Sequence, residues 1–498
     1  MDNNESQGVN GTIQNKTVKG MFWTGLEMLG RQGAAFIIQI FLARLLLPED
    51  FGLIGMLTIF ISLSNVLIDV GFQTWLLHEK EPTEEEFSTV FFFNLGIAIL
   101  LYCLLFLSAP AVAKFYGRPI LAPMLRVLGI TLIMNAFALV QRTQLTIKLN
   151  FKVQTVITAY AICFSGGIAI FCAYLGLGVW SLVLQQVLNT TIASLLTVFV
   201  NRWVPLWKFQ ISSFKKMFGY SWKLVASTML DTAYNNLNAI LIGRFFSAAS
   251  LGYFSNAQKM QDVIPRSLSG AVQKVSFPVL SRYKEDQKIL SDAFSRILKL
   301  VSLVAIPVSF GLSGTGTEIF QLVFGEKWLS AVPYFKIMAL TASCYPIHVL
   351  NLNLLQIVGR TDRFLALELV KKAIGLVTTL ITLFIFRSVM ALVILDFFMN
   401  FITLYINGFY TEEIIGYSLI HQMKDLTRAF FSGGVMLVAI SIVGFTLHQG
   451  PLILLLVKIV VGCCVYLGAS CLFNREEMKR LMEIAGWLMK QKQKKEKL

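Results

Sequence analysis

Long apolar runs recur along this chain from about residue 22 to residue 473, separated by Pro, Gly and charged residues. A transmembrane helix needs about 20 predominantly apolar residues, because the hydrocarbon core of a bilayer is about 30 Å thick. Runs of that length predict fourteen spans, near residues 22–46, 51–77, 87–112, 120–142, 153–175, 179–201, 217–243, 251–280, 294–314, 330–358, 364–386, 389–410, 427–447 and 451–473. The expected fold is therefore an all-α integral membrane protein.

The composition excludes a soluble enzyme. Of the 498 residues, 56% are hydrophobic and 14% are charged, whereas soluble domains are about 45–50% apolar and about 25% charged. No polar stretch between apolar runs is as long as the roughly 50 residues that an independent domain needs, so we expect no appended catalytic domain. Residues 1–20 are polar and do not resemble a cleaved signal peptide. The seven cysteines and four histidines are not clustered, so the sequence predicts neither a metal site nor a cofactor.

The distribution of Lys and Arg predicts the topology. With the N-terminus inside, the cytoplasmic segments hold about 28 of these cations, Arg142 among them, and the outer segments hold about 7. This bias predicts an even number of spans with both termini in the cytoplasm. It also explains most of the net charge of +15, so we expect no nucleic-acid partner.

An internal repeat links the first and seventh predicted spans. Arg44 is followed by Gly52, and 200 residues later Arg244 is followed by Gly252 in a matching context. Six spans separate the copies, so both halves enter the membrane in the same direction and are related by an axis along the membrane normal. Two pseudo-symmetric six-helix lobes are typical of an alternating-access carrier.

Five segments follow from the spans and the repeat. They are a cytoplasmic N-terminal segment at 1–20, an N-lobe at 21–207, a C-lobe at 208–424, a further helix pair at 425–473 and a basic amphipathic cytoplasmic tail at 474–498. The tail has apolar residues at helical spacing with lysines and arginines between them, which is typical of a helix on the inner leaflet.

Short motifs at the ends of the spans carry a family resemblance. They are Lys19-Gly20-Met21-Phe22-Trp23, Arg44-Leu45-Leu46-Leu47-Pro48-Glu49-Asp50-Phe51-Gly52, Leu251-Gly252-Tyr253-Phe254, Phe277-Pro278-Val279-Leu280-Ser281 and Gly359-Arg360-Thr361-Asp362. Through them, residues 20–473 resemble the multidrug/oligosaccharidyl-lipid/polysaccharide flippase superfamily, and within it the Wzx-type polysaccharide exporters of the colanic acid exporter branch. The resemblance implies a fourteen-span carrier with a cationic central cavity, which moves undecaprenyl-pyrophosphate-linked oligosaccharide from the inner to the outer leaflet of the bacterial cytoplasmic membrane. A polysaccharide polymerase and a chain-length regulator are possible partners.

Charged residues inside spans are the candidate pyrophosphate ligands, because a charge at a helix centre costs about 2.5–3.5 kcal/mol on insertion and so tends to face a cavity or a partner. Lys259, Arg266 and Lys274 are seven and eight residues apart in the eighth span, within an arc of about 100°. Arg31 in the first span is four residues from Glu27, and a pyrophosphate could compete with that carboxylate for it. We expect these four cations to bind the phosphates. The alternatives are that Lys274 extends to the membrane surface and that Glu27 and Arg31 form a structural ion pair.

Polar stripes in the second and seventh spans are the candidate sugar ligands. Asn65, Asp69 and Gln73 follow one another at intervals of four, and Asp231, Asn235 and Asn238 at intervals of four and three. The amides of Asn65, Gln73, Asn235 and Asn238 suit sugar hydroxyls. Asp69 and Asp231 are candidates for proton or sodium coupling, or for hydrogen bonds between helices. In the eleventh span, Glu368, Lys371 and Lys372 are expected to neutralise one another.

Three other functions compete with this interpretation. A multidrug/cation antiporter of the same superfamily usually stops near twelve spans and has an acidic cavity. A lipid II flippase differs in its cargo alone. A membrane polymerase or ligase needs a large outer loop with catalytic side chains, whereas the longest outer loop expected here, Thr315–Ser330, offers no acid/base constellation. The chain also lacks a Walker A sequence, so direct use of ATP is not expected.

Overall fold

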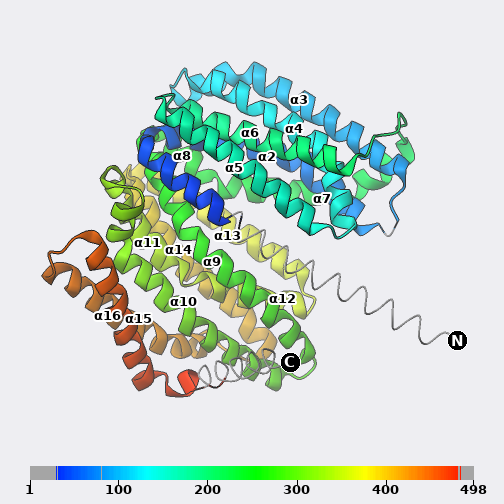
Figure 1. Ribbon diagram of the computed structural model, residues 1–498. Helices are drawn as coiled ribbons and strands as arrows, with labels where there is room; N and C mark the ends of the chain where they lie inside the picture. The colour runs from blue at the N-terminus through cyan, green and yellow to red at the C-terminus, as the bar shows by residue number, and fades with distance from the viewer. Residues whose placement is uncertain (1–29, 31, 80, 480–482, 484–498) are drawn as a thin grey trace, which may run out of the picture. The chain divides into compact units, whose positions relative to one another are not determined.

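Helices are the regular elements of the computed structural model, which describes residues 30, 32–79, 81–479 and 483. Contacts divide the chain into two compact units, unit 1 at Met1–Gly252 and unit 2 at Tyr253–Leu498. Unit 1 contains a helix at Gln32–Leu45 and helices α2 (Pro48–His78), α3 (Glu84–Tyr116), α4 (Leu121–Ile147), α5 (Phe151–Tyr174), α6 (Val179–Asn201), α7 (Ile211–Asn235) and α8 (Leu237–Phe245) (Figure 1). Helix α9 (Ala248–Arg282) crosses the boundary.

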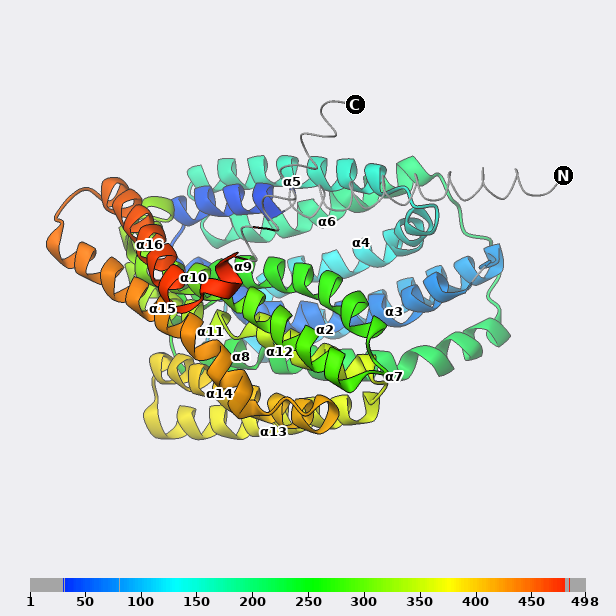
Figure 2. The ribbon, with the colours of Figure 1, turned by 90° about the horizontal axis from the view of Figure 1, so that it is seen from below.

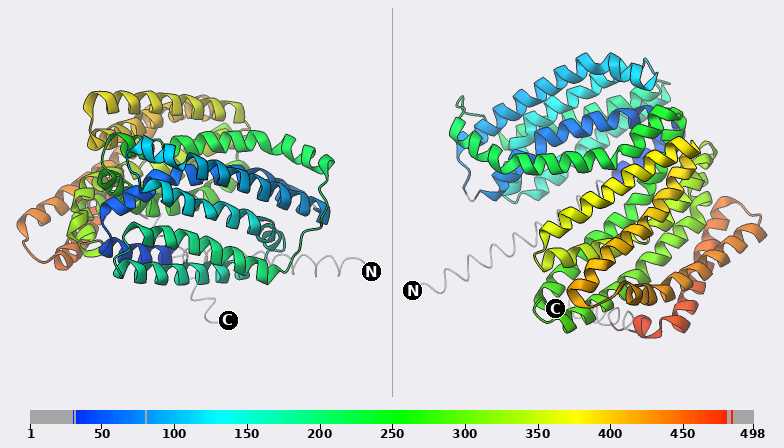
Figure 3. Two further views of the ribbon diagram at one scale, coloured as in Figure 1. Left: turned by 90° about the horizontal axis from the view of Figure 1, so that it is seen from above. Right: turned by 180° about the vertical axis from the view of Figure 1, so that it is seen from behind.

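Unit 2 continues with α10 (Gln287–Val323), the 3₁₀ helix η1 (Glu326–Ala331), α11 (Val332–Ala342), α12 (Tyr345–Ile357), α13 (Thr361–Phe386), α14 (Val389–Ile415), α15 (Leu419–Thr446) and α16 (Pro451–Phe473). Helices α13 and α14 lie side by side, and so do α15 and α16 (Figures 2 and 3). Helix α10 packs against both α15 and α16 and so joins that pair to the rest of the unit.

Eleven helical segments of the described chain are long and apolar enough to cross a membrane. They coincide with eleven of the fourteen expected spans, which confirms an all-helical, multi-pass membrane protein. The other three expected spans fall on the helix at Gln32–Leu45, on α7 with α8, and on α9. The beginning of the first expected span, with Glu27, lies outside the described residues.

The core of unit 1 lies where α2, α3, α4 and α7 meet. Large side chains there are almost fully buried, including Ile68 and Trp75 of α2, Phe91 of α3 and Leu132 of α4. Helix α7, which falls in the expected C-lobe at 208–424, packs along α2 within unit 1, and the two expected lobes remain a prediction. The Ser221 hydroxyl of α7 donates to the Gly71 carbonyl at 2.7 Å. A Cβ on Gly71 would lie 2.8 Å from the Ser221 Cβ, so glycine permits this close approach.

The seventh expected span is interrupted. Helix α7 ends at Asn235 and α8 begins at Leu237, with Asn236 between them at φ −99° and ψ 1°. The Asn236 side-chain amide donates to the Thr232 carbonyl at 2.8 Å. Asparagine side chains compete in this way with the backbone for hydrogen bonds and favour helix ends. The polar residues of this span therefore do not follow one continuous helix, contrary to the stripe expected from their spacing.

A second break divides the tenth expected span between α11 and α12, at Ser343 and Cys344. Pro346 lies in the first turn of α12. A proline has no N–H to donate and disfavours helical geometry in the residue before it, so it begins a helix more readily than it continues one. The two short helices together still form one candidate span.

The longest expected outer loop, Thr315–Ser330, is mostly helical. Helix α10 extends through this segment to Val323, and η1 follows at Glu326. Glu318, which was placed in that loop, is buried within α10. The expectation of a loop was wrong because Gly314, Gly316 and the charge of Glu318 interrupt the apolar run without ending the helix.

The N-terminal turns of α2 and α9 cross at two glycines. A Cβ on Gly52 would overlap the backbone carbonyl of Ala248, and a Cβ on Gly252 would overlap the carbonyl of Pro48. Each pair is related to the other by the 200-residue offset of the repeat. Reciprocal contacts of this kind are what a local two-fold axis produces.

Candidate functional site

A polar cluster in unit 1 joins α2 to α4. The Asn135 side-chain Nδ2 donates to both carboxylate oxygens of Asp69 at 2.9 Å and to Asn65 Oδ1 at 3.2 Å. The Asn135 oxygen accepts from Arg142 Nη1 at 3.2 Å. All four side chains are half-buried. The cluster therefore links a carboxylate to a guanidinium through one amide.

Helical spacing brings these four residues together. Asn65 and Asp69 are four residues apart on α2, and Asn135 and Arg142 are seven apart on α4, so each pair lies on one helix face. Unpaired polar groups are costly inside a membrane span, and hydrogen bonds between helices reduce that cost. The structure thus gives Asp69 and Asn65 partners that the sequence analysis did not identify. Their proposed roles in coupling and sugar binding remain predictions.

Asn135 and Arg142 are the site residues that the sequence analysis missed. Arg142 was counted as a cytoplasmic loop cation because the fourth span was expected to end there, whereas α4 continues to Ile147. The signal was present in the spacing, since Asn135 and Arg142 are two helical turns apart within an otherwise apolar stretch.

The other expected sugar and coupling residues lie on α2 and on either side of the break between α7 and α8. Gln73 is half-buried one turn beyond Asp69 on α2. Asn235, at the end of α7, is exposed. Asp231 and Asn238 are half-buried on either side of the break, and both take part in interactions.

The cationic stripe lies on a continuous helix. Lys259, Arg266 and Lys274 all belong to α9, so their expected angular spacing holds for the backbone. The Lys259 side chain is exposed. The side chains of Arg266 and Lys274, and the whole of Arg31, lie outside the described part of the structure. Pyrophosphate binding by these four residues therefore remains a prediction.

Unit 2 contains a buried polar layer between α12, α13 and α14. His348 lies between Asn400 and Asn407, with its Nε2 3.3 Å from Asn400 Oδ1 and its Nδ1 3.2 Å from Asn407 Nδ2. Lys371 Nζ lies 3.3 Å from Asn407 Oδ1 and forms an ion pair with Glu368. The expected neutralisation of Lys371 by Glu368 is present. His348 is isolated in the sequence, because its partners Asn400 and Asn407 lie more than 50 residues further along the chain.

A buried ion pair joins α10 to α16. Lys458 Nζ lies 2.7 Å from Glu318 Oε1, and the two side chains are 7% and 6% exposed. Lys458 also donates to the Gly314 carbonyl at 3.3 Å. This pair joins α16 to α10 within unit 2. The described residues contain no group of three or more His, Cys, Asp or Glu side chains placed to hold a metal ion.

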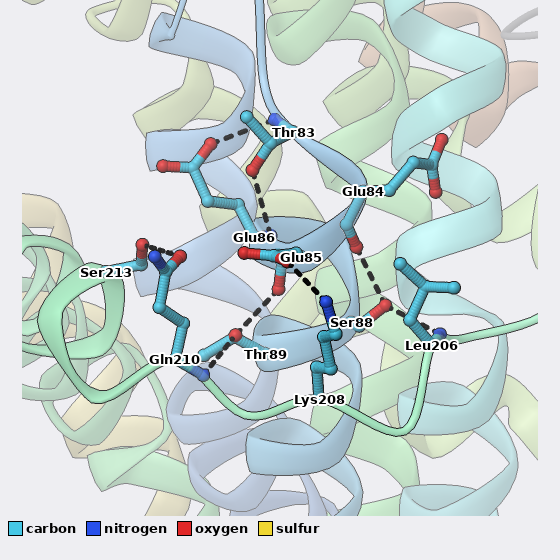
Figure 4. Close-up of polar contacts among 10 residues, drawn as sticks. All are labelled: Thr83, Glu84, Glu85, Glu86, Ser88, Thr89, Leu206, Lys208, Gln210 and Ser213. Carbon is cyan, nitrogen blue, oxygen red and sulfur yellow. Dashed lines mark hydrogen bonds and ion pairs between the residues drawn. The ribbon is translucent and has the colours of Figure 1, made fainter.

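The linker between α6 and α7 is held against the first two turns of α3 (Figure 4). The Leu206 N–H donates to Ser88 Oγ at 2.9 Å, and the Gln210 N–H donates to Thr89 Oγ1 at 3.1 Å. Lys208 forms an ion pair with Glu85 at 3.0 Å. A capping box of Thr83 and Glu86 begins the same helix. The linker is therefore fixed by hydrogen bonds from its backbone N–H groups to side-chain hydroxyls of α3.

The sequence matches a known protein family and is similar to known biosynthesis proteins. Residues 41–333 match the family described as "Polysaccharide biosynthesis protein". The teichuronic acid biosynthesis protein TuaB of Bacillus subtilis is 27% identical over 301 residues, which are 60% of this chain and 62% of TuaB, less than two thirds of its length. The lipopolysaccharide biosynthesis protein WzxC of Escherichia coli is 23% identical over 66% of this chain and 67% of WzxC.

The fold also matches a solved structure. The lipid II flippase MurJ in an inward closed conformation superimposes with a TM-score of 0.72, covering 92% of this chain and all of the MurJ chain. The sequence identity is 14%, so this comparison identifies the fold and not the cargo.

Proposed function

The chain belongs to the polysaccharide biosynthesis protein family, and from that membership we propose that it is a flippase for lipid-linked glycans. The cargo is an undecaprenyl-pyrophosphate-linked oligosaccharide repeat unit, which moves from the inner to the outer leaflet by alternating access for surface polysaccharide assembly. The match of residues 41–333 to the family is the observation that carries the proposal. The eleven apolar helices and the flippase-like fold support it.

The chemistry of such a cargo sets the demands on the protein. A pyrophosphate is anionic and must cross the hydrocarbon core with cationic partners, because an unpaired charge there is costly. We assign this role to Arg31, Lys259, Arg266 and Lys274. Guanidinium and ammonium groups bind phosphate oxygens by charge-assisted hydrogen bonds. The exposed position of Lys259 on α9 suits contact with a cargo.

The sugar is proposed to contact the amides of Asn65, Gln73, Asn235 and Asn238. Of these, Asn235 is exposed, and Asn65 belongs to the cluster with Asp69, Asn135 and Arg142. That cluster gives Asp69 a further proposed role as a coupling residue, because protonating its carboxylate would weaken both hydrogen bonds from Asn135. Asp231 is the corresponding candidate on α7. The driving gradient is a proton or sodium gradient, and the protein needs no cofactor and carries out no covalent step.

The protein is proposed to act in the bacterial cytoplasmic membrane with both termini in the cytoplasm, next to a polysaccharide polymerase and a chain-length regulator. The bias of Lys and Arg between inner and outer segments supports this topology. A lipid II flippase and a multidrug/cation antiporter are the alternatives within the same fold, and the nature of the cargo separates the three.

Deletion of the gene followed by mass spectrometry of undecaprenyl-linked glycans tests the proposal. We expect the repeat unit to accumulate and surface polysaccharide to disappear, while lipid II stays at its normal level. Accumulation of lipid II would instead identify a lipid II flippase. Unchanged lipid-linked glycans together with new sensitivity to cationic drugs would identify an antiporter. Either of these results would overturn the proposal.

A further inference from the structure

The His348 ring is enclosed between two side-chain amides in unit 2. Its exposed fraction is 8%, and that of Asn407 is 2%. His348 comes from α12, whereas Asn400 and Asn407 come from α14, two turns apart on one face. Each ring nitrogen lies against one amide. The protonation of the ring is therefore governed by which end of each amide faces it.

The amide of Asn400 faces the ring with its oxygen. Its Nδ2 donates to the backbone carbonyl of Asp396 at 2.9 Å. A carbonyl can only accept a hydrogen bond, so the amide nitrogen is committed to it and Oδ1 faces His348 Nε2. An amide oxygen is also only an acceptor. Nε2 must therefore carry a hydrogen.

The amide of Asn407 faces the ring with its nitrogen. Its Oδ1 lies 3.3 Å from Lys371 Nζ. A lysine ammonium group can only donate, so the amide oxygen is committed to it and Nδ2 faces His348 Nδ1. Nδ1 must therefore accept and carries no hydrogen. The two asparagines together hold the ring neutral with its proton on Nε2.

The position of Lys371 keeps the Asn407 amide in this orientation. The Lys371 ammonium has a second partner, the carboxylate of Glu368 one turn earlier on α13. The exposed side-chain fraction is 26% for Glu368 and 11% for Lys371. The chain of contacts thus runs from the partly exposed carboxylate of Glu368 on α13, through Asn407 on α14, to the buried imidazole of His348 on α12. Helices α13 and α14 lie side by side (Figure 3).

The elements packed against α12 carry further charged groups. Helix α10 meets α12 through apolar side chains, including Phe294 and Leu298 against Leu350. Helix α15 presents Gln422 to Asn351. Helix α9 contacts α12 through Ser276 and Asn353. The remaining described titratable side chains on these elements are Tyr253, Lys259, Asp262 and Arg282 on α9, Lys288, Asp292, Arg296, Lys299 and Glu318 on α10, Arg363 and Lys372 on α13, Asp396, Tyr405, Tyr410, Glu412 and Glu413 on α14, and His421, Lys424, Asp425 and Arg428 on α15.

Several of these groups have ionic partners of their own. Lys299 pairs with Asp425 at 3.2 Å, Glu318 with Lys458, and Glu413 with Arg360 and Arg363. Within the contacts described, Lys371 reaches the ring through Asn407.

We propose that His348 is a conformation-dependent proton site. While Lys371 contacts Asn407, the ring excludes a second proton. When Lys371 leaves Asn407 and keeps only its ion pair with Glu368, the Asn407 amide can turn over and present its oxygen to the ring, and Nδ1 then takes up a proton from the aqueous phase. The ligand of this site is a proton, and its uptake and release follow the contact between α13 and α14.

A role in driving transport rests on the proposed function, because only a carrier would use such uptake and release. The hydrogen-bond polarity itself does not depend on any cargo. The site can therefore be tested on the purified full chain alone.

Nitrogen NMR of the ¹⁵N-histidine-labelled protein in lipid nanodiscs is the test, since the resonances of protonated and bare ring nitrogens are well separated. The chain has four histidines, and loss of one signal set in His348→Gln assigns the site. In the wild type at neutral pH we expect His348 to be protonated on Nε2 and bare on Nδ1. A proton on Nδ1 would overturn the proposal.

Variants of the two controlling residues test the mechanism. Lys371→Met should give a population with the proton on Nδ1, because the Asn407 amide can turn over, whereas Lys371→Arg keeps a donor and should keep the wild-type spectrum. Asn407→Asp replaces the amide with an acceptor and should make the ring doubly protonated. Asn353→Asp, at another buried asparagine of α12 that contacts Ser276, should leave the His348 signals unchanged.

The outcomes separate the two proposals. An unchanged His348 spectrum in both Lys371→Met and Asn407→Asp refutes the proton site, and leaves the flippase proposal standing. Asn407→Asp keeps the test valid should Lys371→Met fail to fold. If the wild type does not flip lipid-linked glycan in a reconstituted assay, the flippase proposal is refuted. The His348 spectrum would then still need an explanation. If both hold, His348→Gln should remove the dependence of transport on the proton gradient, and retained dependence would contradict the coupling role.

Discussion

Gly52 and Gly252 lie at reciprocal positions in one helix crossing, each against the backbone of the other's helix. They are 200 residues apart and occupy equivalent places in the internal repeat. The carbonyls that they approach, those of Ala248 and Pro48, are related by the same offset. The repeat recognised in the sequence therefore corresponds to a contact that only residues without a side chain can make.

Alanine at either glycine should destabilise the protein. Gly52→Ala and Gly252→Ala place a Cβ on a backbone carbonyl that cannot move alone, and overpacking of this kind costs about 1–3 kcal/mol or more. Gly96→Ala on α3 is the matched control, because nothing lies within 4 Å of its Cβ position. That change should be neutral or stabilise by up to about 1 kcal/mol. Thermal unfolding in detergent, followed by size-exclusion chromatography, measures all three, and equal melting temperatures would contradict the crossing.

Breaking the Glu318–Lys458 pair should lower the free energy of unfolding more than breaking an ion pair at the surface does. Lys458→Met removes the ion-pair partner of a buried carboxylate, which costs about 3–5 kcal/mol. The double variant with Glu318→Leu removes both charges and should recover most of that loss. The exposed Lys208–Glu85 pair is the control, and Lys208→Met should cost less than about 1 kcal/mol. A double variant no more stable than Lys458→Met would show that α16 is held by something else.

The backbone amides of the linker between α6 and α7 should exchange hydrogen faster when the side-chain oxygens that accept from them are removed. Ser88→Ala and Thr89→Val delete the oxygens that accept from the Leu206 and Gln210 amides. A hydrogen bond contributes about 1 kcal/mol, so exchange at these amides should accelerate about five-fold per bond. Hydrogen exchange detected by mass spectrometry measures this exchange rate on peptides that cover the linker. Unchanged exchange there, with a folded protein, would mean that these contacts do not hold the linker.

Removing the Asn135 amide from its cluster should lower the stability of the protein more than removing one member of a neutral amide pair. Asn135→Leu removes both hydrogen bonds to Asp69 and the acceptor of Arg142, and an unsatisfied buried charged group costs about 1–3 kcal/mol or more. Asn201→Leu is the comparison, because Asn201 joins α6 to α4 through the neutral amide of Gln144 at 2.6 Å. We expect the larger drop in melting temperature for Asn135→Leu. Equal drops would indicate that Asp69 is stabilised by other groups.

Eleven spans were predictable because an apolar run of about 20 residues has few alternatives to a membrane helix. The breaks after Asn235 and at Ser343 were not predicted, because each lies inside a segment that was interpreted as one continuous span, at 217–243 and 330–358. Composition sets whether a segment spans the membrane, whereas a proline or an asparagine sets where its helix is interrupted.

The candidate site was predictable in part. The ion pair of Glu368 and Lys371 follows from spacing within one helix. The partners of His348, Asp69 and Glu318 come from other helices, and which helix faces are in contact depends on packing that no single span reveals. The four expected pyrophosphate ligands rest on spacing and on the family resemblance.

A flipping assay on the purified full chain tests the central claim most directly. The protein is reconstituted in vesicles with an undecaprenyl-pyrophosphate-linked oligosaccharide, and the sugar accessible to periodate from outside is measured over time. We expect the wild type to expose the whole pool, whereas protein-free vesicles and the folded variant Arg31→Ala with Arg266→Ala expose about half, as two unmixed leaflets would. Lys424→Ala, at an exposed cation on α15, should flip like the wild type. Half-exposure with the folded wild type, or full exposure with the double variant, would contradict the account.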